Sequence, residues 1–557
     1  MQRSIRLSTE KRINNLNICS LLFFTIWACC VLMPVYALAS EQSDFYQLSV
    51  NLKAGEISVR AELRDIAKAE KLCLPAFGQR YGESLSHPRV LDTSGKPVAV
   101  KFDAAGCLNQ LEASSLVFQY VVSMAALPQG RFWVASELSP YYDGSSLIFP
   151  GESLFIERDA SASVNGVQGA RVELIGGGQT VTTLKLSDQS GEYPIYSARD
   201  KFELTRSYWA MGTSRVVVAS SGQMTWTLAV DPKWQTNVNV MERELTQILS
   251  YYGNLLPLKT PQRLSIFLFS LPFDAHYSHG FARHGGIVLQ MGQSAASQGA
   301  ARRVLMAHEL FHLYNGEGLR FSPKDYAGTA WFREGMTQYI AFKSLLTLGL
   351  ISHEQFQEWM TSSIVRTMSA KQHGQLHKAD FAYHHGFFTS LAIEQQWALH
   401  HTGYNLENFW YFLSQHKAWN ALQTNASIRE LLTAYSAFDF QDFFKQYITG
   451  KRPLPIESLL KLSGYCFRPM TTWRYSIGVE YAYDALNARL YVKSLDPNGA
   501  GAQAGLKIGD WIVPESDMRW EDAADKKITV IRGNSTLQMR IPALGVMQKG
   551  ISVENCR

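Results

Sequence analysis

The spacing of apolar residues changes twice along the 557-residue chain, and these changes limit what it can fold into. From residue 41 to about 225, stretches such as FYQLSVNL, ARVELIG and SRVVVAS alternate apolar and polar residues, which is typical of antiparallel strands. From about Ala300 to Gln446 the apolar residues recur at helical intervals. Alternation returns after Tyr465. Because one hydrophobic core cannot serve so long a chain, the pattern predicts a multidomain α+β fold.

The same pattern predicts the order of the domains. We expect a β-sandwich-like N-terminal domain over 40–228 and a mostly helical domain over 229–451. The second begins with a helix from Thr236 and the strands RLSIFLFSLP and GGIVLQMG. The range 452–557 opens with RPLPIESLL, whose prolines are typical of a linker, and continues as a small β domain.

Residues 1–39 have the features of an export signal. The basic start MQRSIRLSTEKR precedes the apolar run ICSLLFFTIWACCVLMPVYALA, which closes with the small-x-small pattern that signal peptidase cuts. We expect a cleaved signal of bacterial Sec type and a periplasmic or secreted chain. Two alternatives stay open: an uncleaved membrane anchor, since a span needs about 20 residues, and a lipid on Cys29. No later segment is apolar enough to span a membrane.

The charge balance gives no sign of a nucleic-acid partner. The whole chain carries a net charge of +5, and without residues 1–39 there are 49 basic and 47 acidic residues, which leaves +2. The basic excess therefore belongs largely to the leader. A nucleic-acid-binding face would need clustered basic residues, so we expect no such partner.

Of the seven cysteines, four lie outside the leader: Cys73, Cys107, Cys466 and Cys556. An even number in an exported chain predicts disulfide bonds. Sequence proximity favours Cys73 with Cys107 and Cys466 with Cys556, and four buried free thiols are the alternative. None of the four has the spacing of a zinc site.

The stretch VLMAHELFHLYNG (304–316) carries two histidines four residues apart. On a helix, residues with this spacing share one face, so His308 and His312 can hold one metal ion. Glu309 is rotated by about 100° from His308 and falls beside the metal, where a general base for a water molecule belongs. The motif is short and does not decide the question alone.

A later helix supplies a third ligand. A hydrolytic zinc site takes three protein ligands and keeps one position open. Glu334, in TAWFREGMTQYIAF (329–342), can return to the first helix across the intervening loop. Two imidazoles and a carboxylate favour zinc, so we expect one Zn²⁺ per chain. The alternative is that the histidines are satisfied core residues and Glu334 is a surface residue.

These residues carry a family resemblance. The string HELFHLYNGEGLRFSPKDYAGTAWFREGMTQYIAF resembles the M61 family, the glycyl aminopeptidase-like zinc metallopeptidases. The family shows a Trp/Tyr-Asn pair after its His-Glu-x-x-His helix, then an arginine, then Trp-x-x-Glu-Gly-x-Thr-x-Tyr. Tyr314-Asn315, Arg320 and the segment from Trp331 to Tyr339 match these features.

The resemblance implies a fold and a set of roles. The fold would be a β-rich N-terminal domain, a thermolysin-like peptidase domain and a small PDZ-like domain at the C-terminus. The metal ligands would be His308, His312 and Glu334. Glu309 would be the general base, and Arg320 would lie on the substrate side. The implied activity is zinc-dependent hydrolysis of a peptide or protein substrate.

The string Tyr383-His384-His385-Gly386 resembles the family's Tyr-x-Lys-Gly. The resemblance implies that Tyr383 donates a hydrogen bond to the oxyanion of the tetrahedral intermediate, where negative charge develops. His385 replaces the family's lysine and is expected on the substrate side. The alternatives are that His384 or His385 is the donor, or that Tyr383 is an ordinary aromatic residue at a helix start.

The substrate-side strand departs from the family. HGFARHGGIVLQMG (279–292) stands where members have a Gly-Gly-Leu-Glu-His-like string, and the acidic residue is missing. In related aminopeptidases that carboxylate holds the free amine of the substrate, so exopeptidase and endopeptidase action both stay open. Gly285 and Gly286 are expected to let a peptide backbone lie along the strand.

Near the C-terminus, PNGAGAQAGLKIGDWIV resembles the PDZ signature of exported bacterial proteases. By that resemblance Ile477, Gly478 and Val479 would form a loop whose backbone amides receive a chain terminus or an extended peptide. A purely structural β domain is the alternative. The competing function for the whole chain is therefore a catalytically weak or inactive peptidase-like protein that binds peptides through this domain.

Overall fold

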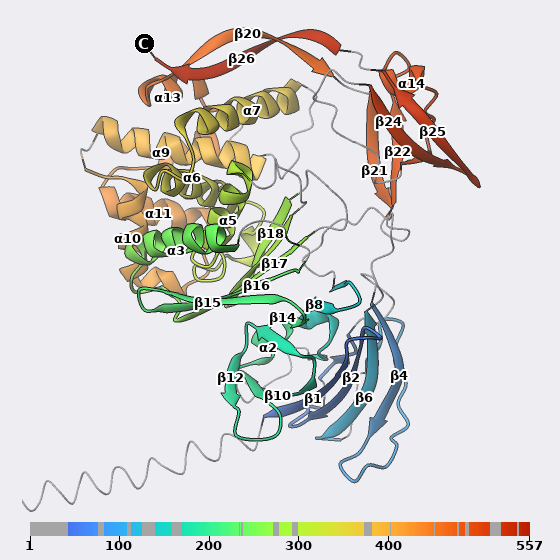
Figure 1. Cartoon of the computed structure of the whole chain (residues 1–557). Helices are drawn as coiled ribbons and strands as arrows, with labels where there is room; N and C mark the ends of the chain where they lie inside the picture. The colour runs from blue at the N-terminus through green and yellow to red at the C-terminus, as the bar shows by residue number, and fades with distance from the viewer. Residues whose placement is uncertain are drawn as a thin grey trace, which may run out of the picture.

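A computed structural model gives the fold of the chain. It describes residues 43–68, 70–75, 83–108, 113–124, 140–158, 169–232, 234, 238–270, 278–283, 285–291, 299–372, 381–400, 403–449, 452–475, 478–484, 489–512, 525–542 and 545–556. The expected leader, 1–39, lies outside the described residues. Figure 1 shows a β-rich N-terminal region, a helical body and a strand-rich C-terminal part, in chain order. The predicted multidomain α+β fold is confirmed.

The N-terminal region holds a sheet with the strand order β12-β13-β10-β1-β2-β6-β4. A second sheet runs β11-β14-β8-β7, and short strands form the order β5-β3-β9. A shared core lies between the two larger sheets, where the rings of Phe149 and Trp209 stack 6.4 Å apart. The bounds are β1 Asp44–Asn51, β2 Glu56–Leu63, β3 Leu72–Cys73, β4 Glu83–Leu91, β5 Cys107–Leu108, β6 Leu116–Met124, β7 Tyr141–Tyr142, β8 Ser146–Pro150, η1 Gly151–Ser153, β9 Glu157–Arg158, β10 Ala170–Gly176, β11 Gln179–Thr182, β12 Lys185–Asp188, β13 Ile195–Ala198, α2 Lys201–Thr205 and β14 Tyr208–Gly212.

A central sheet with the order β15-β16-β17-β19-β18 follows. Its strands are β15 Arg215–Ser221, β16 Met224–Val230, β17 Arg263–Ser270, β18 Ser278–Arg283 and β19 Gly286–Met291. We expected β15 and β16 in the N-terminal domain, with a boundary at 228. That expectation is wrong for these strands, because β16 pairs in parallel with β17 and residue 228 falls inside it. Alternation predicts a strand, but it does not say which sheet the strand joins.

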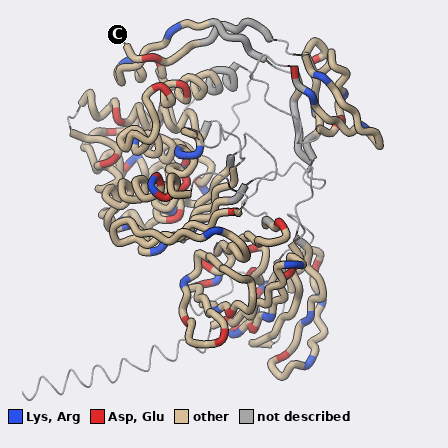
Figure 2. The backbone as a smooth tube through the Cα atoms, in the orientation of Figure 1, with Lys and Arg blue, Asp and Glu red and all other residues tan. Residues whose placement is uncertain are grey.

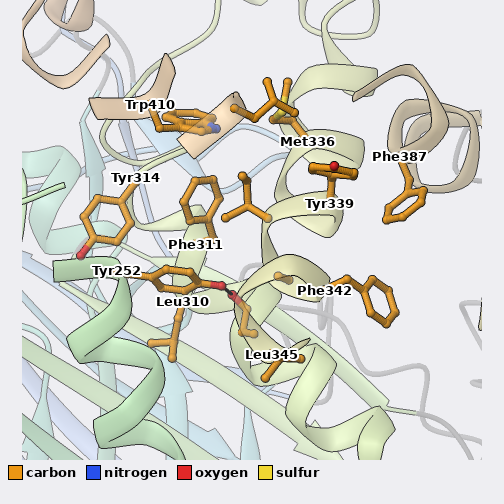
Figure 3. Packing of buried hydrophobic residues seen from close by; sticks show 14 of the residues in the cluster. Tyr252, Leu310, Phe311, Tyr314, Met336, Tyr339, Phe342, Leu345, Phe387 and Trp410 are labelled. Carbon is orange, nitrogen blue, oxygen red and sulfur yellow. Dashed lines mark hydrogen bonds between the residues drawn. The ribbon is translucent and has the colours of Figure 1, made fainter. Parts of the chain in front are cut away.

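Helices cover one face of the central sheet (Figure 1). The helical elements of the body are α3 Val238–Leu255, α5 Ala300–His312, η3 Pro323–Asp325, η4 Trp331–Met336, α6 Thr337–Thr347, α7 His353–Gln372, η5 Phe381–His385, α9 Gly386–His400, α10 Leu406–Gln415, η6 Lys417–Asn420, α11 Asn425–Ser436, α12 Gln441–Phe443, η7 Phe444–Ile448 and α13 Ile456–Leu462. Figure 3 shows how α5 is fixed: the ring of Phe311 packs 5.2 Å from that of Tyr252 and 5.0 Å from that of Trp410. Leu310 is completely buried beside it. The apolar face of α5 therefore sets the direction of its opposite face.

The other face of the central sheet meets the N-terminal region. Tyr208 of β14 packs against Phe267 of β17 and Phe281 of β18, with ring centroids 5.1 and 5.7 Å apart. These rings belong to a buried cluster that both parts of the chain supply. Strand β18 is thereby held between the N-terminal region and the helices.

The C-terminal part begins with α13, which occupies most of the stretch expected to be a linker; the two prolines precede the helix and do not interrupt it. Strands β20 (Tyr465–Tyr475) and β26 (Gly545–Asn555) then form a long antiparallel ribbon. A tail sheet in the order β21-β22-β23-β24-β25 lies at the end of this ribbon (Figure 1). Its elements are β21 Val479–Asp484, β22 Arg489–Leu495, α14 Ala500–Gln503, β23 Trp511–Ile512, β24 Lys526–Arg532 and β25 Ser535–Ile541.

The two expected disulfide bonds are present. Cys73 is bonded to Cys107, and Cys466 is bonded to Cys556. The second bond closes the base of the ribbon, where Tyr465 packs against Phe356 of α7, rather than the ends of the tail sheet. In the described part of the chain, no helix is both long and apolar enough to cross a membrane.

Candidate metal centre

Helix α5 presents His308 and His312 on one face, as their spacing predicts. Their rings meet edge to face with centroids 4.6 Å apart. The helix ends at His312 because the chain then turns at Gly316, whose φ of 149° suits glycine. The backbone carbonyl of Asn315, in this turn, lies 3.0 Å from Nδ1 of His312. That contact fixes the ring and leaves Nε2 to face inward.

The helical turn η4 brings Glu334 to the histidines. Asn315 holds η4 in place, because its side-chain amide donates to the carbonyl of Phe332 at 2.9 Å and to that of Arg333 at 3.2 Å. The turn has π-helical geometry, which occurs often at functional sites. Asn315 thus connects helix α5 to the element that carries the third ligand candidate. We matched this residue to a family motif, but the sequence alone did not reveal its function as a clamp.

The ligand atoms converge. Nε2 of His308 and Nε2 of His312 lie 2.9 Å apart, and Oε2 of Glu334 lies 3.2 Å from the second and 3.5 Å from the first. All three atoms fall within 4.8 Å of one another. Ligands bound to a tetrahedral zinc ion at about 2.0–2.1 Å are about 3.3 Å apart, so the spacing and the donor set both fit Zn²⁺.

Charge interactions couple the three groups. Burial would lower the pKa of His312, but the Glu334 carboxylate outweighs it and raises that pKa to about 9. Burial lowers the pKa of His308. Burial would also raise the pKa of Glu334, yet the two imidazoles hold it well below its ordinary value. The carboxylate is therefore ionised at neutral pH and suited to a cation.

Glu309 lies beside this cluster and against strand β18. A Cβ atom placed on Gly280 would lie 2.4 Å from Cγ of Glu309 and 2.8 Å from its Oε1. Among the described strands, β18 forms an edge of the central sheet. An edge strand can pair with an extended peptide, so Glu309 stands where such a peptide would pass the metal ligands. Gly280 was missed by the sequence analysis, which singled out later glycines.

Tyr383 reaches the cluster from η5. Its ring lies 5.5 Å from that of His308. A Cβ atom on Gly335 would lie 2.2 Å from the backbone of Gly386, so η4 touches the first residue of α9, directly after η5, through its main chain. Burial, together with the carboxylates of Glu334 and Glu309, raises the pKa of the Tyr383 phenol, although the residue is 38% exposed. The phenol therefore keeps its proton and remains a donor.

The neighbouring histidines point elsewhere. Nδ1 of His384 lies 2.9 Å from the hydroxyl of Ser363 on α7. His385 is buried, and its Nδ1 lies 3.3 Å from the hydroxyl of Thr389 on α9. Of the residues in this string, Tyr383 is the one in ring contact with a metal-ligand candidate.

Other residues predicted for the substrate side have different surroundings. A Cβ atom on Gly286 would lie 2.6 Å from the carbonyl of Ser265 and from a methyl of Thr183, and one on Gly285 would lie 3.3 Å from the Thr183 carbonyl. These glycines therefore let the sheet approach the N-terminal region. Arg320 is exposed, and its carbonyl accepts from the amide of Gln423.

The loop that the sequence analysis expected to receive peptides is partly described. Ile477 lies outside the described residues. Gly478 has a φ of 68°, and a Cβ atom there would lie 3.0 Å from Asp496 and Gly499. Its carbonyl accepts from the amide of Asp496 at 2.7 Å. Val479 is half-buried against the core of the tail sheet.

Comparison with known proteins agrees with this geometry. The model of the M61 glycyl aminopeptidase family matches residues 301–406, the range that holds all the metal-ligand candidates, Glu309 and Tyr383. No curated protein sequence matches the chain. Among solved structures, an aminopeptidase N family protein from Idiomarina loihiensis is 15% identical with a TM-score of 0.67, over 92% of this chain and 98% of that one.

An M1 zinc metallopeptidase from Deinococcus radiodurans, solved with a Tyr-Ser-Ala substrate, is 13% identical with a TM-score of 0.50, over 74% of this chain and 94% of that one. At such identities the likeness shows the fold. The family match covers the candidate metal centre itself, so over residues 301–406 the chain is similar to the M61 glycyl aminopeptidase family.

Proposed function

We propose that the protein is an exported zinc peptidase. The observation that carries the proposal is the convergence of His308, His312 and Glu334, with Glu309 against an edge strand beside them. A bound zinc ion would lower the pKa of a water molecule and polarise the scissile carbonyl. The residues of the chain account for the remaining steps.

The edge of β18 aligns an extended peptide past the ligands. Glu309 takes a proton from the attacking water and passes it to the leaving amine, as a general base and then a general acid. The water oxygen adds to the carbonyl carbon, and the C–N bond breaks when the nitrogen is protonated. Tyr383 donates its phenol proton in a hydrogen bond to the oxyanion, which forms beside its ring. The proposal thus gives the proton transfers to Glu309 and the oxyanion contact to Tyr383.

The peptidase could cleave at a free amino terminus or within a chain. The family description points to cleavage at free amino termini. On β18, however, Ala282 follows Gly280 on the same face, and Arg283 pairs with Glu152 at 2.6 Å on the other. We therefore propose that a substrate amine is not held by a carboxylate from this strand. A peptide library with free and acetylated amino termini separates the two modes, because an aminopeptidase leaves the acetylated peptides intact.

The substrate class follows from the same strand. An edge strand recognises extended backbone, so we propose peptides and unfolded protein segments. Figure 2 shows acidic and basic residues interspersed along the described backbone. Nucleic-acid recognition uses a clustered basic face, so we propose no nucleic-acid partner.

Export, domain organisation and the tail sheet belong to the proposal as well. We assign 1–39 as a cleaved signal, so that the mature chain begins at Ser40 in the periplasm, and N-terminal sequencing tests this. The sheets support a β-rich domain that ends near residue 214, a thermolysin-like peptidase domain, and a PDZ-like domain on the ribbon. In the tail sheet, α14 packs over a core with Val492 and Ile528, which is consistent with that assignment.

The test uses the purified mature chain. Metal analysis should give about one zinc per chain, and much less in metal-replete buffer would contradict the proposal. Glu309→Gln should bind zinc and lose cleavage of the library. If cleavage survives this substitution, Glu309 is not the base. If zinc is bound but neither protein cleaves, the alternative of a peptide-binding protein gains support, and binding of carboxyl-terminal peptides to the tail sheet then tests it.

A further inference from the structure

The guanidinium of Arg333 contacts the carboxylate of Glu334, a metal-ligand candidate. Its Nε donates to Oε1 of Glu334 at 3.1 Å. The other oxygen of that carboxylate, Oε2, is the one that faces the two imidazoles. The two oxygens of Glu334 therefore have separate partners. A carboxylate restrained in this way can offer one oxygen to a cation and cannot easily turn to offer both.

Arg333 is itself held in place from behind. Its guanidinium carbon lies 3.5 Å from the ring centroid of Tyr326, so the flat cation is stacked on the flat ring. The segment that carries Tyr326 is pinned, because the adjacent Asp325 accepts the backbone amide of Asn425 at 2.8 Å. Arg333 also has a side chain that is only 12% exposed. The cation is thus positioned by packing and by its contact with Glu334.

Arg333 is buried although not all of its N–H groups are hydrogen-bonded. A buried guanidinium normally has its N–H groups paired, because an unpaired buried donor is costly. Nη1 of Arg333 is buried and has no hydrogen-bond partner among the residues that the structure describes. The side chain stays buried despite the cost of this unpaired donor, and its Nε keeps the contact with Glu334. We take this contact as the reason for the position of the guanidinium.

We propose that Arg333 is a positioning residue of the metal centre. It fixes Glu334 so that Oε2 alone faces the imidazoles, and a zinc ion would keep its fourth position open for water. Tyr326 extends the effect by holding the guanidinium flat. This inference rests on the proposed zinc function. It adds a residue that lies next to the family motif and that the motif does not specify.

The test measures zinc affinity of the mature chain by competition with a chromophoric chelator. Arg333→Met should raise the Kd for zinc by about 10–100-fold, the range for removing a group that orients a ligand. Arg333→Lys retains a cation and should recover part of the affinity. Tyr326→Leu should weaken binding in the same direction, whereas Tyr326→Phe keeps the stacking ring and should not. Lys324→Met, an exposed cation in the preceding turn, is the matched control and should leave the Kd unchanged.

A second readout separates positioning from general damage to the fold. The absorption spectrum of the cobalt(II)-substituted chain reports ligand geometry, and it should change in Arg333→Met while the thermal midpoint shows a folded protein. Wild-type zinc affinity and an unaltered cobalt spectrum in Arg333→Met would overturn the inference. Equal weakening by Arg333→Met and Arg333→Lys would indicate a packing effect and would also overturn it. A wild-type chain that binds no zinc would refute the proposed function itself, whereas zinc binding without cleavage would refute only the peptidase activity.

Discussion

Gly280 of β18 and Glu309 of α5 touch so closely that a single added carbon would not fit between them. A Cβ atom on Gly280 would meet Cγ, Cδ and Oε1 of Glu309 at 2.4, 2.8 and 2.8 Å. One contact therefore positions the edge strand and Glu309, the proposed general base. The absence of a side chain at residue 280 lets the carboxylate lie between the strand and the metal ligands.

Gly280→Ala should impair catalysis without removing the metal. The new methyl group would force the Glu309 carboxylate to move by roughly 1 Å, and a displacement of that size can lower kcat about 100-fold. Zinc content should stay the same, because the three atoms nearest to the new methyl group all belong to Glu309, which is not a ligand candidate. Steady-state kinetics and metal analysis on the same preparation check both points. Gly191→Ala, in a roomier site, is the control, and a normal kcat in Gly280→Ala would show that Glu309 is not constrained by β18.

Tyr383→Phe should lower kcat about 100- to 1,000-fold, the effect of removing one oxyanion donor. The ring remains and still packs 5.5 Å from that of His308, so zinc affinity and KM should change little. Tyr411→Phe, at an exposed position, is the matched control. If kcat is unaffected by Tyr383→Phe, the oxyanion donor lies elsewhere, and His384→Asn becomes the next variant to measure.

The sequence predicted the parts of the candidate metal centre that follow from the helical repeat alone. His308 and His312 fall on one face of any helix, and Glu309 falls beside them. Glu334 followed from the need for a third ligand and from the family motif. The structure brings the ligand atoms of His308, His312 and Glu334 within 4.8 Å of one another.

What sequence reasoning missed depends on contacts between distant segments. Gly280 matters because it contacts Glu309, on a helix that begins twenty residues later. The glycines that the sequence analysis chose in its place, Gly285 and Gly286, pack against Thr183. The contact of Gly335 with Gly386 likewise joins turns 51 residues apart in number. Strands β15 and β16 alternate as expected, yet they pair with β17, which no local pattern could reveal.

His385 should make the stability of the fold depend on pH. Burial lowers its pKa to about 4, below the value of about 6.5 for an unfolded chain. Between these values the unfolded state binds more protons, so the free energy of unfolding falls as the pH is lowered from about 6.5 towards 4. At about 1.4 kcal/mol per pKa unit, the loss from pH 7.5 to 5 is about 2 kcal/mol.

His385→Gln removes this proton and should flatten the pH dependence by that amount. Urea unfolding of both proteins at pH 7.5 and 5, under the same metal conditions, gives the difference directly. The metal-ligand histidines titrate equally in both, so their contribution cancels. His400→Gln, at an exposed position, should retain the wild-type slope. An unaltered slope in His385→Gln would mean that His385 is protonated in the folded state at pH 5.

The disulfide between Cys466 and Cys556 should stabilise the attachment of the ribbon to the helical body. It closes a segment of 90 residues, and bonds of this kind contribute about 2–4 kcal/mol. Without it, the base of the ribbon keeps the bond from the amide of Val553 to the hydroxyl of Thr361, at 2.9 Å, and the ring contact of Tyr465 with Phe356. The double variant Cys466→Ser/Cys556→Ser should therefore exchange amide hydrogens faster over 465–475 and 545–555, with unchanged zinc content. The double variant Cys73→Ser/Cys107→Ser should leave exchange in the ribbon as it is. Equal protection of the ribbon with and without the bond would show that packing on α7 alone holds it.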